Sequence, residues 1–423
     1  MRFNTLDDWL AWQETLHAKK MDLGLGRVWE ALLRLGIQRP EYRILTVAGT
    51  NGKGSTVAVC ANVLSSAGYR VGTFTSPHLF HYRERISIAG RYLDDAELMA
   101  LFDTIDRARG DTTLTYFEFA FVAGALAFSR NDIHVAILEV GLGGRLDAVN
   151  ALDPDAAMVV SVGLDHTGWL GHDREAIGFE KAGVFRAGRP AIVGDPDPPK
   201  SVIDHAASIG AHLRRVGATF DWHAEPDQSR WRYRDDHWDL RDLPLPGGQQ
   251  GYLLANAAGA LALLGSVRNS LPVPRAAITA GLSKPGPRGR LERHVITGAQ
   301  WIFDVAHNPD GSAALARELG SWPSKRSLAL VAVMADKDIA AMLGNLNSHV
   351  DEWWVTATGT GRGADPAVVA RHLLELGADD VQVRPDVGAA IDAIRDAASP
   401  GDRVIVFGSF HMVGPALEYL GLY

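Results

Sequence analysis

A glycine-rich loop with a single lysine lies at residues 47–56, VAGTNGKGST, and this combination can bind phosphate groups. An apolar run at 44–48, predicted to be a strand, precedes the loop, and a helical pattern that extends to Ala67 follows it. In this arrangement backbone N–H groups and the positive end of the helix attract phosphate, while the lysine adds a mobile positive charge. The alternative is a glycine turn that only joins strand to helix, but the strand–loop–helix context favours an ATP or GTP site.

The loop departs from the usual phosphate-loop pattern in a way that predicts metal ligands elsewhere. Gly54 follows the lysine at the position where Ser or Thr normally binds Mg²⁺. Three candidate ligands follow apolar strands: Ser76 in TSPHL, Glu139 in LEVGLGG and His166 in GLDHTGWLG. Each alone could be a turn serine, a charged strand end or a loop histidine. Because the carboxyl ends of such strands converge on one crevice, we expect these side chains to bind Mg²⁺.

Short apolar runs alternate with longer helical patterns along the chain, which is typical of βαβ units with a parallel sheet. The predicted strands are residues 44–48, 135–140, 157–162, 191–194, 301–305, 328–334 and 404–408. The segment 220–242 alternates aromatic and charged residues and is interpreted as an exposed hairpin, a solvated strand pair on the first domain.

The chain length predicts two domains, because 423 residues exceed the roughly 250–300 at which a single core usually stops growing. The segment 284–290, KPGPRGR, has two prolines and two glycines and is interpreted as a hinge. The predicted fold class is α/β. Residues 1–285 are expected to form a P-loop-type ATPase domain with a mostly parallel sheet, and residues 286–423 a smaller, Rossmann-like α/β domain.

The composition excludes several classes of protein. Hydrophobic residues make up 47% and charged residues 22%, as in ordinary globular domains. A net charge of −8 argues against a general nucleic-acid-binding surface. The single cysteine, Cys60, cannot form an internal disulfide, the N-terminal segment does not have the pattern of a signal peptide, and no apolar run approaches the roughly 20 residues that span a bilayer. We therefore expect a cytoplasmic protein without membrane or nucleic-acid partners, and a monomer by default.

Eight motifs along the chain carry a family resemblance: GTNGKGST, SPHLFHYRERI, LTYFEF, LEVGLGGRLDAVN, LDHTGWLG, EKAGVFR, FDVAHNPDG and GSFHMVG. In this order they resemble the bacterial dihydrofolate synthase/folylpolyglutamate synthase family, a branch of the Mur ligase superfamily. GTNGK alone indicates only the superfamily, whereas SPHL, LTYFE and LGGRLDA together indicate the folate branch. The resemblance spans nearly the whole chain and is loosest at 196–250.

The resemblance implies a set of nucleotide and metal ligands. ATP is expected to contact Thr50, Asn51, Gly52, Lys53, Gly54, Ser55, Asn256, Arg290 and Asp304. Mg²⁺ is expected at Ser76, Glu139 and His166. Lys181 in EKAGVFR is expected to react with CO₂, so that its carbamate offers oxygen ligands to a second Mg²⁺. Lys53, Glu139, His166 and Lys181 are thus the expected catalytic residues, and a requirement for a monovalent cation stays open.

The resemblance also implies where the substrates bind. The pterin end is expected at Asp22, Leu23, Gly24 and Leu25, at Thr115, Tyr116, Phe117 and Glu118, and at Leu146, Asp147 and Ala148. His307 is expected to help to place glutamate. Locally these residues could equally be helix-entry and loop segments.

The implied activity is ATP-dependent addition of L-glutamate to dihydropteroate and to the γ-carboxyl of folate through an acyl phosphate. Arg290 and Asp304 are expected to cover the ATP from the second domain. Another Mur-type amino-acid ligase, or only one of the two folate activities, is the alternative, although the cell-wall ligases carry a UDP-binding domain and only 48 residues precede Gly49 here. A nucleotide-dependent switch or transport ATPase shares the loop but does not need the DVAHN segment.

Overall fold

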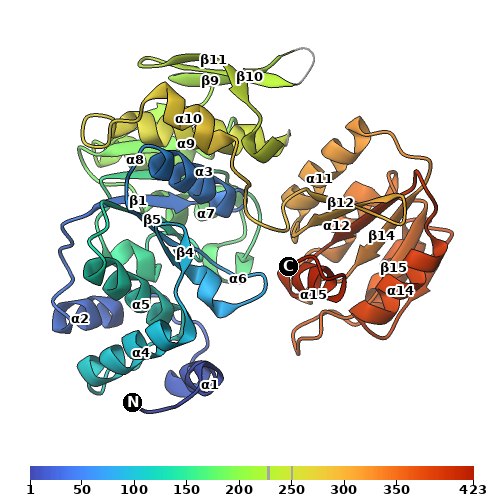
Figure 1. Cartoon of the computed structure of the whole chain (residues 1–423), viewed down its shortest axis with the longest axis horizontal. Helices are drawn as coiled ribbons and strands as arrows, with labels where there is room; N and C mark the ends of the chain where they lie inside the picture. Colours follow the sequence, from blue (N-terminus) through green and yellow to red (C-terminus); the bar gives the residue numbers. More distant parts are fainter. Residues whose placement is uncertain (226–228, 249–250) are drawn as a thin grey trace. The chain divides into compact units, whose positions relative to one another are not determined.

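The computed structural model describes residues 1–225, 229–248 and 251–423 (Figure 1). The chain forms two compact units, Met1–Gly286 and Pro287–Tyr423. The break between them falls within the proline- and glycine-containing segment 284–290.

An eight-stranded sheet forms the centre of the first unit, in the order β4-β3-β2-β5-β1-β6-β7-β8. Strands β2, β5, β1, β6, β7 and β8 are parallel, while β3 and β4 add an antiparallel edge. The strands are β1 (Arg43–Ala48), β2 (Val71–Phe74), β3 (Ile86–Ile88), β4 (Arg91–Tyr92), β5 (Val135–Glu139), β6 (Ala156–Val159), β7 (Pro190–Val193) and β8 (His212–Arg215).

Helices cover both faces of this sheet because its strands are apolar on both sides. In β1, Ile44 and Ala48 belong to one hydrophobic cluster and Leu45 and Val47 to the other. Figure 1 shows α3, α9 and α10 on one face and α2, α4 and α5 on the other. The helices are α1 (Leu6–Leu16), α2 (Gly26–Arg34), α3 (Lys53–Ser66), α4 (Asp95–Arg109), α5 (Tyr116–Arg130), α6 (Thr167–Leu170), α7 (Arg174–Ala182), α8 (Lys200–Ser208), α9 (Tyr252–Ser266) and α10 (Arg275–Leu282), with 3₁₀ turns η1 (Tyr82–Arg85), η2 (Ala148–Ala151) and η3 (Pro246–Gly248).

The described part of the segment 220–242, from which residues 226–228 are left out, does not form the solvated strand pair that its sequence suggested. It belongs to a three-stranded antiparallel sheet of β9 (Phe220–Ala224), β10 (Arg230–Asp235) and β11 (Asp239–Pro244). Trp231 and Tyr233 are fully buried in the cluster that contains α3 and α9. The alternation of aromatic and charged residues therefore marks a sheet with one buried face, and the prediction of a fully solvated pair was wrong.

The second unit contains a six-stranded sheet in the order β12-β13-β17-β14-β15-β16, parallel except for β12. Its elements are β12 (Glu292–Ile296), β13 (Ala299–Asp304), α11 (Pro309–Ser321), β14 (Ser327–Val331), α12 (Ile339–Asn347), β15 (Glu352–Val355), α13 (Pro366–Glu375), β16 (Val381–Val383), α14 (Val387–Ala397), β17 (Arg403–Phe407) and α15 (Phe410–Tyr419). All seven predicted strands are present, as β1, β5, β6, β7, β13, β14 and β17, and the predicted α/β fold class is confirmed.

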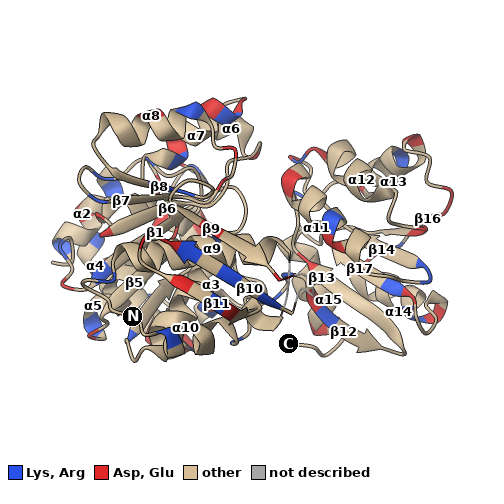
Figure 2. Ribbon diagram, turned by 90° about the horizontal axis from the view of Figure 1, so that it is seen from above, with Lys and Arg blue, Asp and Glu red and all other residues tan. Residues whose placement is uncertain are grey.

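Basic and acidic residues are interspersed over both units (Figure 2). Among the described residues, no helix combines the length and the apolar character needed to cross a membrane.

Candidate active site

The glycine-rich loop lies between β1 and α3, at the carboxyl edge of the parallel strands. Gly52 precedes α3 with a left-handed backbone, φ 84°. A Cβ atom at this position would lie 2.4 Å from Oδ1 of Asn256, so the backbone and the space both require glycine. The first turn of α3 supplies the backbone N–H groups that can bind an anion.

The residue that fixes the loop conformation is Ser161, which follows β6. Its carbonyl accepts a hydrogen bond from the Thr50 N–H at 2.8 Å, and its Oγ accepts one from the Asn51 N–H at 3.0 Å. The Gly163 N–H donates to Oγ1 of Thr50 at 2.9 Å. The end of β6 therefore holds the phosphate loop in place, a role for Ser161 that its sequence context did not indicate.

Lys53 is the first residue of α3 and its ammonium group lies over the loop. Nζ donates hydrogen bonds to the carbonyl oxygens of Gly49 at 3.0 Å and of Thr50 at 3.2 Å. The charge is thus placed on the side of the loop where phosphate oxygens would bind.

Glu139, at the end of β5, brings a buried carboxylate to the start of α3. Oε2 accepts a hydrogen bond from the Ser76 N–H at 3.2 Å. A Cβ atom on Gly54 would lie 3.6 Å from the same oxygen, in ordinary van der Waals contact, so this carboxylate adjoins the residue after Lys53. Two of the predicted metal ligands, Ser76 and Glu139, therefore lie together beside the phosphate loop.

His166 lies in the segment after β6, next to Asp165. It has a left-handed backbone, φ 51°, which is uncommon for a residue other than glycine and occurs at functional sites among other places. The His166 N–H donates to Oδ1 of Asp165 at 2.8 Å, and Nε2 lies 4.0 Å from Oδ2. The ring is 38% exposed, so it can accept a ligand without rearranging the core.

Within residues 1–225, 229–248 and 251–423, no three His, Cys, Asp or Glu side chains are grouped closely enough to hold a metal ion. Mg²⁺ does not need such a group, because it keeps several waters and commonly takes one or two carboxylates plus phosphate oxygens. The hydroxyl of Ser76 and the carboxylate of Glu139 are oxygen donors of the kind that Mg²⁺ prefers. These residues therefore fit the predicted metal.

Lys181, the lysine expected to form a carbamate, lies in α7. Its side chain is buried, and burial lowers its pKa to about 7, with the nearby charge of Lys53 acting in the same direction and Asp165 and Asp147 opposing it. A lysine with this pKa has a large neutral fraction near neutral pH. Lys53, Asp165 and Asp147 thus lie within electrostatic range of Lys181.

Asn256 comes from α9 and lies against the phosphate loop at Gly52. Its Nδ2 is buried and has no hydrogen-bond partner in the described part of the chain, and the same is true of Oγ of Ser55. Buried polar atoms without partners are rare, and at a binding site they are commonly satisfied by a ligand. Both residues therefore suit the predicted contacts with ATP.

The three predicted substrate segments, 22–25, 115–118 and 146–148, are brought together. The Gly24 N–H donates to the carbonyl of Leu146 at 3.1 Å, which joins the first segment to the third. The first segment joins the second through Arg27, described below.

The segment 115–118 begins α5 with a capping box. The Thr115 N–H donates to Oε2 of Glu118 at 2.7 Å, and the Glu118 N–H donates to Oγ1 of Thr115 at 3.3 Å. The ring of Tyr116 lies at right angles to Tyr82, and that of Phe117 packs against Phe74. Thr115 and Glu118 thus order the start of the helix, and the two aromatic residues form an apolar surface beside it.

Asp147 and Ala148 are buried, whereas Leu146, like Leu23 and Leu25, is only half-buried. Burial raises the pKa of Asp147 to about 6, although backbone N–H groups and the charge of Lys53 oppose the shift. This residue connects the third substrate segment electrostatically to the phosphate loop.

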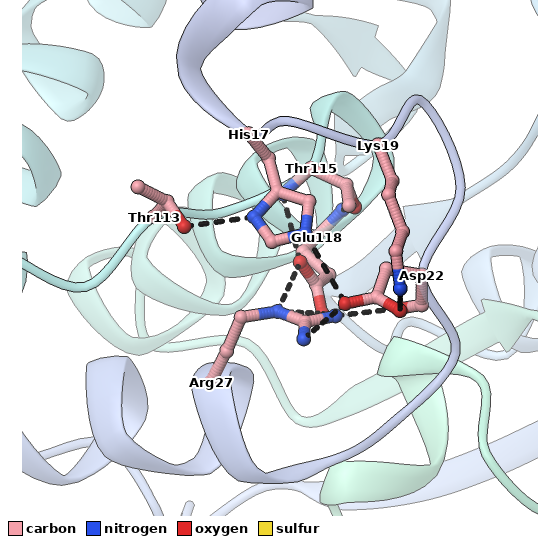
Figure 3. Close-up of polar contacts among 7 residues, drawn as sticks. All are labelled: His17, Lys19, Asp22, Arg27, Thr113, Thr115 and Glu118. Atoms are coloured by element: carbon pink, nitrogen blue, oxygen red, sulfur yellow. Dashed lines mark hydrogen bonds and ion pairs between the residues drawn. The ribbon is translucent and has the colours of Figure 1, made fainter.

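Arg27 connects the first and second segments (Figure 3). Nη1 donates to Oδ2 of Asp22 at 2.7 Å, and Nη2 donates to Oε1 of Glu118 at 2.9 Å. His17 adds a second link, with Nδ1 2.7 Å from Oγ1 of Thr113 and Nε2 3.2 Å from Oδ2 of Asp22. The sequence analysis did not single out Arg27 or His17.

The second unit also brings its predicted residues together. Asp304 ends β13, and its Oδ2 accepts a hydrogen bond from the Leu291 N–H at 2.9 Å. The guanidinium of Arg290 lies 4.9 Å from the centroid of the Phe410 ring, and the His307 ring lies 5.9 Å from the same centroid. A cation, an imidazole and a buried carboxylate thus lie together at the carboxyl end of β13.

Comparison with known proteins identifies two family domains in the chain. The Mur ligase middle domain matches residues 47–262, and the Mur ligase glutamate ligase domain matches residues 289–410. The dihydrofolate synthase/folylpolyglutamate synthase of Escherichia coli is 42% identical over 416 residues, which are 98% of this chain and 95% of that protein.

Two solved structures share the fold over almost the whole chain. E. coli FolC in complex with DHPP and ADP has a TM-score of 0.93 at 41% identity and covers 99% of this chain and 98% of its own. The bifunctional folylpolyglutamate synthase/dihydrofolate synthase of Yersinia pestis, complexed with AMPPNP and Mn, has a TM-score of 0.92 at 42% identity, with the same coverage. The resemblance noted in the sequence is thereby confirmed, and the chain belongs to the Mur ligase family and, within it, to the dihydrofolate synthase/folylpolyglutamate synthases.

Proposed function

We propose that this protein is an ATP- and Mg²⁺-dependent ligase that joins L-glutamate to 7,8-dihydropteroate and to the γ-carboxyl of a folate. Residues 1–285 are assigned as the ATP- and pterin-binding domain and residues 286–423 as the C-terminal ligase domain. The observation that carries the proposal is the phosphate loop, where Nζ of Lys53 lies 3.0 Å from the carbonyl oxygen of Gly49 and Gly54 adjoins the carboxylate of Glu139. The charge of Lys53 acts on Asp147 in the substrate segment 146–148, which supports a substrate site beside the phosphoryl donor.

A carboxylate does not condense with an amine at neutral pH, because oxide is a poor leaving group. The substrate carboxylate therefore attacks the γ-phosphorus of ATP, giving an acyl phosphate and ADP. The amine of glutamate then attacks the acyl carbonyl, and phosphate leaves as the amide forms. No covalent bond to an enzyme side chain is required.

Electrostatic stabilisation of the phosphoryl group is the main contribution of the chain. Lys53 and the N–H groups at the start of α3 bind phosphate oxygens, and Asn256, Arg290 and Asp304 are assigned to ATP. Ser76, Glu139 and His166 are assigned to Mg²⁺, which neutralises charge on the phosphates when bound.

Lys181 is assigned as a carbamate. Only a neutral amine attacks CO₂, and the nitrogen loses a proton as the N–C bond forms. The pKa of about 7 supports this step because it leaves much of the amine neutral. The product is a carboxylate in a position where the chain encodes a lysine.

The proposal is tested by a parallel assay with ATP, Mg²⁺ and labelled glutamate, in which either dihydropteroate or a reduced folate monoglutamate is the acceptor. Labelled product is expected from both acceptors. Product from folate alone would reduce the activity to a polyglutamate synthase, and product from dihydropteroate alone to a dihydrofolate synthase. No product from either acceptor would overturn the proposal.

The proposed enzyme works as a monomer in the cytoplasm. A chain with one cysteine cannot form an internal disulfide, which suits a reducing compartment. Sedimentation of the purified protein should give a mass near 45.7 kDa, and a value twice as large would contradict the monomer.

A further inference from the structure

The guanidinium of Arg27 binds Glu118, which is 91 positions away along the chain, and it also binds Asp22. On one side it binds Asp22 twice, at the carboxylate through Nη1 and at the backbone carbonyl through Nη2. On the other side it binds Glu118. Nη2 donates to Oε1 at 2.9 Å, and Nε donates to both carboxylate oxygens at 3.2 Å. Figure 3 shows the guanidinium between the two carboxylates.

The two partners differ in how firmly the fold holds them. Glu118 is 3% exposed and belongs to the capping box of α5, so its position is set by a helix. Asp22 lies in the connection between α1 and α2, where none of residues 17–25 is buried or belongs to a helix or strand. Apolar packing therefore does little to fix this connection, and polar contacts must determine its position.

The contacts made by Asp22 are consistent with this requirement. The hydrogen bond from Lys19 is the largest of the effects that lower the pKa of Asp22. His17 and Arg27 lower this pKa too, while desolvation of the carboxylate raises it. Of these three partners, Arg27 alone also binds Glu118. The link from this connection to α5 therefore runs through the guanidinium, with the contact between His17 and Thr113 as a second link.

We propose that Arg27 is a positioning residue for the pterin substrate. It holds the segment 22–25 against the start of α5, so that the segments 22–25, 115–118 and 146–148 form one surface. The hydrogen bond from Gly24 to Leu146 completes this surface from the other side. The inference rests on the proposed function, because the site that Arg27 orders is the proposed pterin site.

The chemistry of this link requires arginine. A planar guanidinium can bind one carboxylate through Nε and Nη2 while Nη1 binds another, whereas a lysine ammonium is a point charge without this fork. Arg27→Lys should therefore restore only part of the function that Arg27→Met removes.

The test compares Arg27→Met, Arg27→Lys and the wild type by steady-state kinetics in the dihydropteroate reaction. KM for dihydropteroate should rise about tenfold in Arg27→Met, equivalent to about 1.4 kcal/mol, with a smaller rise in Arg27→Lys. KM for ATP should not change, and kcat at saturating dihydropteroate should stay close to the wild-type value. The matched control is Arg214→Met, because Arg214 also binds two carboxylates, Asp235 and Asp236, but lies in β8.

Several outcomes would overturn the proposal. An unchanged KM for dihydropteroate in both Arg27 variants would show that the link does not order the site. Parallel losses for ATP and dihydropteroate, or the same loss in Arg214→Met, would indicate a general structural role. If Arg27→Met does not fold, the comparison rests on Arg27→Lys, which keeps the charge. Failure of the wild type to use dihydropteroate would instead refute the proposed function, and the inference with it.

Discussion

The Ser76 N–H donates a hydrogen bond to Oε2 of Glu139, and this contact joins the ends of β2 and β5 beside the start of α3. The serine hydroxyl and the carboxylate are thereby held next to the phosphate loop. We propose that this arrangement supplies the metal ligand that Gly54, without a hydroxyl, does not provide.

Glu139→Gln should therefore weaken Mg²⁺ binding while it preserves the shape of the side chain. The Mg²⁺ concentration for half-maximal rate should rise by more than the roughly 10-fold that loss of an outer-sphere partner costs. A Mg²⁺ titration of the rate measures this change. Glu97→Gln is the control, since Glu97 pairs with exposed Arg91, and an equal response in both variants would contradict the metal assignment.

Lys53→Ala should abolish nearly all turnover with the fold intact. The substitution removes the charge over the phosphate loop, so kcat should fall by about a hundredfold or more, as for loss of one transition-state donor. Alanine is a good helix former, so the melting temperature should change little. Lys200→Ala is a matched control, because Lys200 is likewise the first residue of its helix, α8. A kcat near the wild-type value at a normal melting temperature would remove the basis for the ATP site.

Lys181→Ala should be inactive and partly restored by a short carboxylic acid, such as acetate, that can take the place of the carbamate. Lys53→Ala should not respond to acetate, which separates replacement of the carbamate from a general salt effect. In the wild type, labelled bicarbonate should give a carbamate signal in carbon-13 NMR that is lost as the pH falls through about 7, because protonated amine does not react. Absence of the signal above this pH would contradict the modification.

The unmodified lysine should also affect stability. Its pKa is about 7 in the folded protein against 10.5 ordinarily, so unfolding takes up a proton between these values. In buffer free of CO₂, the free energy of unfolding should therefore rise with pH across this window. The contribution of Lys181 is present above 10.5 and is lost as the pH falls through about 7. Chemical denaturation should show that Lys181→Met lacks this component, and identical pH profiles would contradict the burial of a neutral amine.

The sequence was sufficient for the central strands, because β1, β5 and β6 are mostly apolar and are buried on both faces. It was not sufficient for β10, where Trp231 and Tyr233 alternate with arginines. The alternation is compatible with an exposed hairpin, and only the packing of one face against α9 distinguishes a buried sheet.

Some residues of the site belong to a local sequence pattern, whereas others depend on contacts between distant positions of the chain. Residues 49–56 form a local pattern that predicts phosphate binding. The pairing of Arg27 with Glu118 joins positions that are 91 residues apart, and no spacing in a single sequence indicates such a pair. The lowered pKa of Lys181 likewise depends on burial and on Lys53, which are properties of the tertiary structure.

The two folate reactions should respond differently to substitutions in the pterin segments. They share acyl-phosphate chemistry, but the reacting carboxylate lies at a different distance from the pterin in each substrate, so one phosphate loop requires two ways of placing the pterin. Substitutions in 115–118 or 146–148 should therefore impair the dihydropteroate reaction more than folate extension. Leu146→Ala is the sharpest test, because this half-buried side chain can be shortened without opening the core.

The two reactions are measured in parallel on Leu146→Ala and on Leu213→Ala, a half-buried leucine of β8 that serves as the control. The ratio of kcat/KM for dihydropteroate to that for folate monoglutamate should fall in the first variant and stay at the wild-type value in the second. Equal losses in both reactions would show that Leu146 does not distinguish the two placements of the pterin. Since a shared placement cannot bring both carboxylates to one phosphate loop, the residues that distinguish the placements would then have to be assigned elsewhere.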